Sequence, residues 1–198
     1  MNYKAWEIGE IIKLLTPRPG EKILDIGCNV GDLCNMLKLA HSVQPTGIDI
    51  NGVAISIANE KYPGIYFEES DILNINKDFP GFGQYDGITL VQVIEHITDP
   101  EAGVQICNDL LKPGGRIVLT TINKWAYFNK MICLLTGKKF IFYQDPSHIT
   151  QFDPRMIRSI LERNGFEVEK IGTVSTAFNM TIPTMIFGII LYALAKKA

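Results

Sequence analysis

The feature that most constrains the fold is a regular alternation of strand-like and helix-like segments. Short apolar runs bounded by turn residues indicate buried strands, and apolar residues at helical spacing indicate helices. The expected strands are 22–26, 46–50, 65–68, 85–91, 116–121 and 166–171, and the expected helices are 3–15, 32–39, 51–61, 100 to the Lys-Pro-Gly-Gly turn at 112–115, and 154–164. Five strand-then-helix units predict an α/β fold with a doubly wound, mostly parallel sheet and helices on both faces.

The length of the chain predicts one domain. With 198 residues, 46% of them hydrophobic, the chain can bury a core without disulfides. Within the single domain 1–198 we expect an N-terminal helix in 1–19, a ligand-binding core in 20–123, an insertion in 124–148, the last helix and strand in 149–177, and an apolar tail in 178–198.

Charge, cysteine content and the first residues of the chain indicate which partners, metal sites and cellular location to expect. A formal net charge of −2 gives no basic field for a phosphate backbone, so nucleic acid is not expected as a partner. The four cysteines form no C-x-x-C pair, which predicts neither a disulfide framework nor a zinc site. Because Glu7 and Glu10 interrupt the first apolar residues, no signal peptide is expected, and a cytoplasmic location is predicted.

Two regions exceed the alternating scheme. The insertion 124–148 is rich in aromatic residues and follows the fifth strand, so we interpret it as a lid over a substrate, with plain packing as the alternative. The tail contains an apolar run, 182–195, that is shorter than the roughly 20 residues of a membrane span. It is open to three readings: a core helix, a homodimer contact, or a helix lying on a membrane as a peripheral anchor.

The ends of the expected strands carry the residues that suggest chemistry, because ligands of open parallel sheets bind at the carboxyl ends of the strands. The first strand leads into the turn "DIGCNVGD" at 25–32, Asp49 ends the second, Asp71 follows the third, and Glu95-His96 follows the fourth. A dinucleotide requires G-x-G-x-x-G to admit its pyrophosphate, and here Asn29 stands where the second glycine belongs. The turn therefore favours a nucleoside cofactor without a pyrophosphate, such as S-adenosylmethionine.

Five motifs in order carry a family resemblance. They are Leu24-Asp25-Ile26-Gly27-Cys28-Asn29-Val30-Gly31, Gly47-Ile48-Asp49-Ile50, Ser70-Asp71-Ile72, the segment from Tyr85-Asp86-Gly87-Ile88 to Val93-Ile94-Glu95-His96-Ile97 and Asp99-Pro100, and Leu110-Leu111-Lys112-Pro113-Gly114-Gly115-Arg116-Ile117. The chain resembles the class I S-adenosylmethionine-dependent methyltransferases, especially the branch with the ubiquinone-pathway enzymes. That resemblance implies a Rossmann-like sheet, normally closed by an antiparallel seventh strand. Either 174–190 supplies this strand, or the sheet lacks it.

The resemblance also implies the cofactor site. Its acidic residues would be Asp49, which holds the ribose, Asp71, which meets the adenine amino group, and Asp25. The full set of expected cofactor-binding residues is Asp25, Gly27, Cys28, Asn29, Gly31, Asp49, Ile50, Asp71, Ile72, Val91 and Gln92. Asn29 departs from the usual glycine, but asparagine tolerates the left-handed conformation better than most residues.

Catalytic candidates are fewer. For a hydroxyl acceptor a general base is useful, and His148 is the first candidate, followed by His96 and Glu95, with structural roles as the alternative for each. The chain has three histidines without ligand spacing, so no metal site is predicted.

These residues together predict methyl transfer to an oxygen, nitrogen or carbon atom of a small or lipid-like acceptor. Two alternatives remain from the sequence: a cofactor-binding or interaction module without catalysis, and a nucleotide-linked oxidoreductase, which the missing glycine disfavours.

Overall fold

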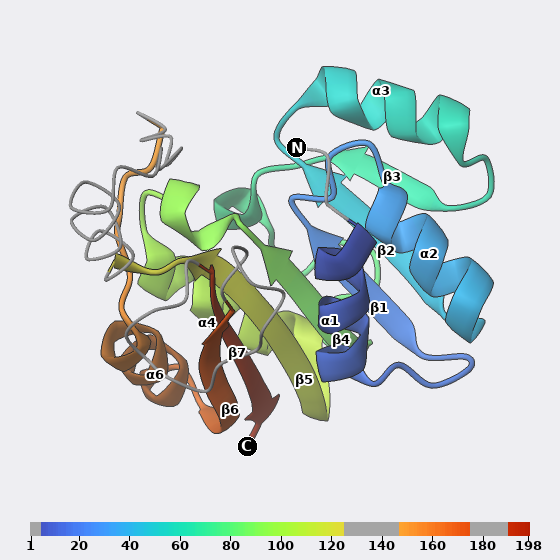
Figure 1. Cartoon of the computed structure of the whole chain (residues 1–198). Coiled ribbons are helices and arrows are strands. Elements are labelled where there is room, and N and C mark those ends of the chain that lie inside the picture. The colour runs from blue at the N-terminus through green and yellow to red at the C-terminus, as the bar shows by residue number, and fades with distance from the viewer. Residues whose placement is uncertain (1–4, 125–146, 175–189) are drawn as a thin grey trace, which may run out of the picture.

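The protein folds around one central sheet. The structure is a computed structural model that describes residues 5–124, 147–174 and 190–198 (Figure 1). The strands are β1 (Lys22–Ile26), β2 (Gln44–Asp49), β3 (Tyr66–Glu69), β4 (Tyr85–Val91), β5 (Leu111–Ile122), β6 (Phe166–Val174) and β7 (Ile190–Lys197). The helices are α1 (Ala5–Leu15), α2 (Asp32–His41), α3 (Gly52–Lys61), α4 (Pro100–Leu110) and α6 (Pro154–Arg163), with 3-10 turns η1 (Ile72–Asn74) and η2 (Ile94–His96).

The sheet order is β3-β2-β1-β4-β5-β7-β6, and β7 runs antiparallel to both of its neighbours. The remaining pairs, β1 with β2 and β4, β2 with β3, and β4 with β5, are parallel. The predicted doubly wound, mostly parallel sheet is therefore confirmed. Because the chain starts at β1, goes to β3 and then returns to β4, the strand order reverses between β1 and β4, which is where such sheets bind ligands.

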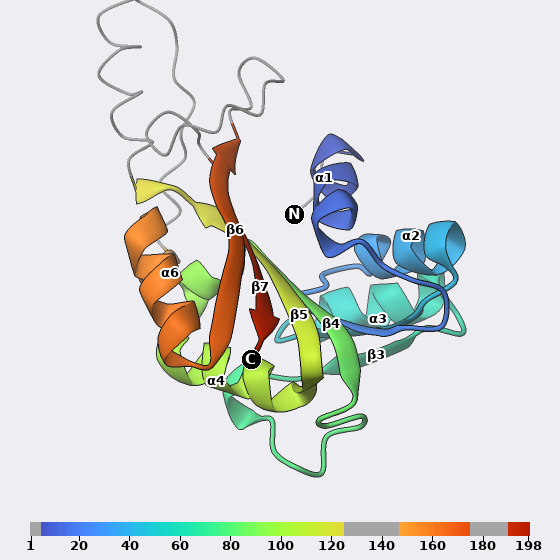
Figure 2. The same ribbon diagram turned by 90° about the horizontal axis from the view of Figure 1, so that it is seen from below.

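Helices cover both faces of the sheet. Figure 2 shows α1, α2 and α3 on one side and α4 and α6 on the other. Successive side chains of a strand point to opposite faces, and β1 illustrates the result: Ile23 packs in the cluster under α1 and α2, whereas Leu24 packs in the cluster under α4 and α6. Both residues are fully buried.

Helix starts follow local capping chemistry. Asn51 and Asp153 each accept hydrogen bonds from two backbone N–H groups of the first helical turn, and Asp99 accepts one from the Ala102 N–H. Pro100 and Pro154 occupy the first helical positions. Two predicted strands, 22–26 and 85–91, match the structure residue for residue. β5 begins at Leu111 rather than at residue 116, because Leu111 already pairs with Tyr85 across an irregularity in the ladder.

The tail contributes a strand. The expectation of a helix over 182–195 is wrong where the structure describes this stretch, because residues 190–197 form β7 between β5 and β6. Leu191, Ala193 and Ala195 are buried in the cluster under α4 and α6, and Leu194 packs against the opposite cluster. The sheet thus has its seventh strand. The residues that form it, 190–197, follow the range 174–190 in which the sequence analysis placed it. Within the described ranges, no helix combines the length and apolar character needed to cross a bilayer.

Most of the aromatic insertion, residues 125–146, lies outside the described residues, and so does the lid predicted for it. The residues on either side of it are described. Asn123 forms a parallel bridge with Phe152, and the Lys124 N–H donates to the Phe152 carbonyl at 2.7 Å. The N–H groups of Ile149 and Thr150 donate to the carbonyl of Glu95 at 2.8 and 3.2 Å. Residues 147–150 therefore lie against η2.

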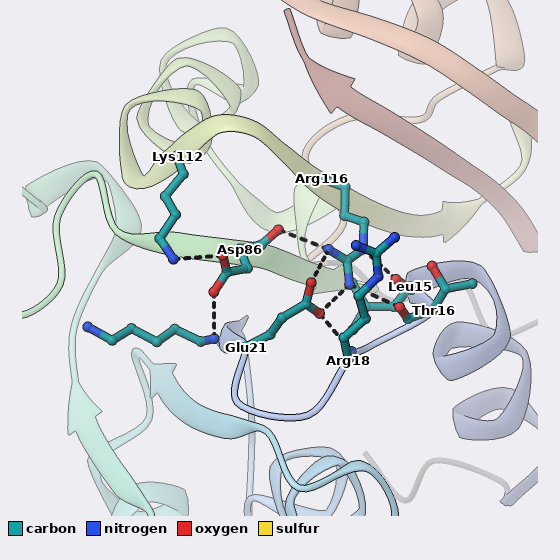
Figure 3. Close-up of polar contacts among 8 residues, drawn as sticks. Leu15, Thr16, Arg18, Glu21, Asp86, Lys112 and Arg116 are labelled. Atoms are coloured by element: carbon teal, nitrogen blue, oxygen red, sulfur yellow. Dashed lines mark hydrogen bonds and ion pairs between the residues drawn. The ribbon is translucent and has the colours of Figure 1, made fainter.

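A charge network ties together the amino-terminal edge of the sheet, opposite the carboxyl ends of β1 and β4 (Figure 3). The Arg116 guanidinium donates to both carboxylate oxygens of Glu21, at 3.1 and 2.6 Å, and to the backbone carbonyls of Leu15, Thr16 and Asp86. Burial would raise the pKa of Glu21, but hydrogen bonds from Arg116 and from the Arg18 backbone outweigh it and lower that pKa. This network joins α1, β4 and β5.

Candidate active site

The turn after β1 has the backbone conformation that its glycines predict. Gly27, Asn29 and Gly31 all have positive φ, at 76°, 49° and 80°. The N–H groups of Gly27 and Cys28 donate to the Ile48 carbonyl at 2.7 and 2.9 Å, which closes the turn against β2. A Cβ on Gly27 would lie 2.2 Å from the Cγ2 of Val93, so a side chain is excluded there. Asn29 adopts the left-handed conformation of the glycine it replaces.

Two acidic side chains are fixed at the neighbouring strand ends. The Asp49 Oδ2 accepts from the Asn29 N–H at 2.8 Å, and its Oδ1 accepts from the Asn51 N–H at 2.9 Å. Asp49 thereby links the turn after β1 to the start of α3. The Asp71 Oδ1 accepts from the Leu73 N–H at 3.0 Å and begins η1. Each carboxylate keeps acceptor capacity beyond these backbone bonds, because an ionised carboxylate has about four lone-pair sites.

These residues border a cavity of about 470 Å³ at the carboxyl ends of the parallel strands. Nine of the predicted site residues line it: Gly27, Asn29, Asp49, Ile50, Asp71, Ile72, Val91, Gln92 and His96. The rest of the lining is Ile26, Ser70, Leu73, Val93, Ile97 and Thr98. The described lining carries the carboxylates of Asp49 and Asp71, the hydroxyls of Ser70 and Thr98 and the His96 imidazole, and it contains no lysine or arginine.

Gln92 lies at the cavity in an unusual conformation. Its φ is +55°, which is rare for a side chain of this size and costs about 1 kcal/mol or more. The Gln92 N–H donates to the Thr120 carbonyl at 2.9 Å, and its side-chain amide donates to the Thr120 hydroxyl at 3.4 Å. Gln92, the first residue after β4, is therefore strained, and its hydrogen bonds to Thr120 of β5 hold it in this conformation.

Three predicted cofactor residues do not line the cavity: Asp25, Cys28 and Gly31. Asp25 is fully buried, accepts from the Thr89 hydroxyl at 2.7 Å and from the Cys34 thiol at 3.7 Å, and burial raises its pKa to about 7. These contacts link β1, β4 and α2. The sequence interpretation missed this pairing, although a threonine in the apolar 85–91 run is a signal for a buried polar partner.

The two thiols near the turn are not activated. Burial raises the pKa of Cys28, and the charges of Asp25 and Asp49 raise it further. Burial also raises the pKa of Cys34. Cys28 therefore behaves as a buried side chain that packs in a small cluster with Cys34 and Phe67.

The three predicted catalytic residues come together. Glu95, His96 and His148 each offer a ligand-capable atom within 4.8 Å of the others, and the His96 and His148 rings meet edge to face with centroids 4.8 Å apart. His96 lines the cavity, whereas Glu95 is 2% exposed and lies behind it. The His96 Nδ1 lies 3.1 Å from both the carbonyl and the hydroxyl oxygen of Ser147, a partner that sequence reasoning did not identify. The third histidine, His41, ends α2 and is not part of this cluster.

Fold and site together define a class of protein. A sheet ordered β3-β2-β1-β4-β5-β7-β6 with β7 antiparallel, and an acidic cavity at the carboxyl ends of β1, β2 and β4, is the class I methyltransferase architecture. Residues 5–171 match the family of methyltransferase domains. The chain therefore belongs to that family, whose class I members use S-adenosylmethionine as cofactor, and the resemblance read from the five motifs is confirmed.

Similar proteins agree with this assignment. A ubiquinone biosynthesis O-methyltransferase of Albidiferax ferrireducens is 32% identical over 155 residues, which cover 75% of this chain and 59% of the relative. The enzyme of the same name from Marinobacter nauticus is 32% identical over 109 residues, covering 53% of this chain and 45% of the relative. The chain thus matches about half the length of these relatives. An S-adenosylmethionine-dependent methyltransferase structure from Mesorhizobium loti has a TM-score of 0.71 at 18% identity, covering 95% of this chain and 96% of that one.

Proposed function

We propose that the protein transfers the methyl group of S-adenosylmethionine to a hydroxyl oxygen of a small, lipid-like acceptor. The observation that carries this proposal is the 470 Å³ cavity, which has two fixed carboxylates and, among its described lining, no lysine or arginine. Its volume is within the range of about 300–1,000 Å³ that is typical of small-molecule sites. The O-methyltransferase names of the similar proteins support oxygen as the acceptor atom.

The polar groups of the cavity fit the cofactor. We assign the ribose hydroxyls to Asp49, whose two oxygens each accept one backbone N–H and retain further lone pairs. We assign the adenine amino group to Asp71, with Ile50 and Ile72 as apolar neighbours of the base. The backbone of Gly27, Asn29, Val91 and Gln92 would border the methionine part. Asp25, Cys28 and Gly31 would act from behind the lining by shaping the turn.

The cofactor supplies a sulfonium methyl group that is already a good electrophile. The protein's contribution is consequently alignment, with the acceptor oxygen held about 3 to 3.5 Å from the methyl carbon and in line with the sulfur. The acceptor hydroxyl must also lose its proton. We assign this task to the cluster of Glu95, His96 and His148, of which His96 lines the cavity.

Turnover assays with hydroxyl-bearing acceptors test the proposal. His148→Ala should bind S-adenosylhomocysteine as the wild type does, while turnover falls by at least about 100-fold, the range of general acid–base contributions. His41→Ala, which alters the histidine outside the cluster, should leave turnover unchanged. If His148→Ala turns over at the wild-type rate, His148 has no part in the mechanism. Cofactor binding without turnover across hydroxyl, amine and carbon acceptors would instead support a module without catalysis.

A further inference from the structure

Gln92 is the residue at which the chain leaves the sheet beside the cavity. It follows β4, lines the cavity and is only 9% exposed. Its φ of +55° lies in the left-handed region, which glycine adopts freely and a residue with a longer side chain adopts only where its surroundings hold it there. The cause of this conformation is therefore a contact from another part of the fold.

Thr120 of β5 supplies that contact in two ways. Its carbonyl accepts from the Gln92 N–H at 2.9 Å, and its hydroxyl accepts from the Gln92 side-chain amide at 3.4 Å. The first bond uses only backbone atoms of Thr120, whereas the second requires an acceptor in the side chain of residue 120. Thr120 is 5% exposed and is not among the residues that line the cavity, so it acts on a bound molecule through Gln92.

The conformation of Gln92 determines where the next residue lies. Val93 follows directly and lines the cavity, and its Cγ2 occupies the space beside Gly27, where a Cβ would lie only 2.2 Å from it. The turn after β1 and the exit from β4 therefore meet at this contact. A change of Gln92 to negative φ would redirect the chain after β4 and move Val93 away from Gly27. Both sides of the cavity consequently depend on the conformation of Gln92.

We propose that Thr120 is a positioning residue of the cofactor site, because its hydroxyl holds Gln92 in the left-handed conformation that shapes the cavity. The inference rests on the proposed function, in which the backbone of Val91 and Gln92 borders the methionine part of S-adenosylmethionine. When only a fraction of the molecules has the binding conformation, the apparent affinity is reduced by that fraction. Loss of the Thr120 hydroxyl should therefore weaken cofactor binding without removing any contact with the cofactor.

Calorimetric titration of S-adenosylhomocysteine into variants of Thr120 tests the proposal. Thr120→Val keeps the shape of the side chain and removes the hydroxyl, so the affinity should fall about 2- to 10-fold, the equivalent of one hydrogen bond. Thr120→Ser retains a hydroxyl and should restore the affinity of the wild type.

Thr121→Val is the matched control. Thr121 is the next residue of β5 and points to the opposite face of the sheet. It is fully buried, and its hydroxyl has no hydrogen-bond partner in the described part of the chain. The same substitution at this position should leave the affinity for S-adenosylhomocysteine unchanged.

Substitutions of Gln92 separate positioning from a merely structural role. Glycine adopts a φ of +55° without strain and has no side-chain amide, so Thr120→Val should cause no further loss of affinity when it is combined with Gln92→Gly. Gln92→Ala also lacks the amide but keeps the preference for negative φ, and it should bind S-adenosylhomocysteine more weakly than Gln92→Gly. A structural effect of Thr120→Val would instead lower the affinity equally in both backgrounds.

Far-UV circular dichroism and urea denaturation verify the fold of each variant. Wild-type affinity in Thr120→Val, or the same loss in the wild-type and Gln92→Gly backgrounds, overturns the role of Thr120 and leaves the cofactor assignment intact. No binding of S-adenosylhomocysteine by the folded wild type refutes the cofactor assignment, and this inference with it. If Thr120→Val does not fold, the comparison of Gln92→Ala with Gln92→Gly decides the question, and equal affinity of these two variants overturns the proposal.

Discussion

Arg116 is predicted to contribute far more to stability than an exposed arginine. The substitution Arg116→Leu removes the five hydrogen bonds to Glu21, Leu15, Thr16 and Asp86 (Figure 3). The side chains of Arg116 and Glu21 are only 17% and 15% exposed. An exposed ion pair contributes about 0–1 kcal/mol, and breaking a buried one costs about 3–5 kcal/mol.

The side-chain exposure of the Arg116–Glu21 pair is closer to that of a buried pair, so we expect the cost of breaking it to lie between these limits and nearer the upper one. Thr16 and Asp86, two of the three residues whose carbonyls lose their donor, line a polar cavity of about 400 Å³, where water can replace the guanidinium, so these two carbonyls add little to the cost. We expect a loss of about 2–4 kcal/mol in the free energy of unfolding, measured by urea denaturation, and a lower Tm by roughly 4–16 °C.

Arg158→Leu is the matched control. Arg158 pairs with Glu162 one helical turn away, with side chains 45% and 51% exposed, so its loss should cost about 0.5 kcal/mol or less. The effect of Arg116 should also depend on pH. The pKa of Glu21 is lower in the folded protein than its ordinary value of 4.5. The Arg116–Glu21 pair therefore contributes fully to stability above pH 4.5, and this contribution is lost as the pH falls through the folded pKa. Equal costs for Arg116→Leu and Arg158→Leu would refute the reasoning.

Three further predictions concern β1 and the turn that follows it. Gly27→Ala should destabilise the fold by at least about 2 kcal/mol, because its φ is +76° and its Cβ would contact Val93, whereas Gly9→Ala, with open space around it, should be neutral or stabilising in the same urea titration. Asn29→Gly keeps the left-handed conformation and should preserve S-adenosylhomocysteine affinity; a complete loss in calorimetry would mean that the asparagine side chain is required. Burial raises the pKa of Asp25 from 3.8 to about 7, so the contribution of Asp25 to stability is complete below pH 3.8 and is lost as the pH rises through 7. Asp25→Asn does not titrate, and its stability relative to the wild type should therefore increase by up to roughly 4 kcal/mol between these pH values. If the stability of the two proteins varied with pH in parallel, the raised pKa of Asp25 would be contradicted.

Much of the fold could be predicted because its signals are local. β1 and β4 are apolar runs with turn residues on both sides, and α4 and α6 begin at Asp-Pro pairs that cap a helix. The residues 190–195 gave no such signal. Their leucines and alanines favour a helix, and a strand buried on both faces has no alternating pattern to separate it from a buried helix. Only pairing with β5 and β6 makes them a strand.

The candidate site divides in the same way. Gly27, Asp49 and Asp71 could be predicted because each stands at the end of an expected strand, and all three line the cavity. The partnership of Asp25 with Thr89 could not, since it depends on the register between β1 and β4. The convergence of Glu95 with His148 depends on backbone hydrogen bonds between distant segments, which leave no spacing pattern in the sequence.

The most direct test of the account is calorimetric titration of S-adenosylhomocysteine into the wild type, Asp49→Ala and Glu60→Ala. We expect one molecule bound per chain in the wild type and the Glu60 variant, because Glu60 is an exposed residue of α3 outside the cavity lining. Asp49→Ala should bind at least about 10-fold more weakly, since hydrogen bonds to a charged group contribute about 1.5–3 kcal/mol. Absence of binding by the folded wild type, or equal binding by all three proteins, would contradict the assignment of the cavity to this cofactor.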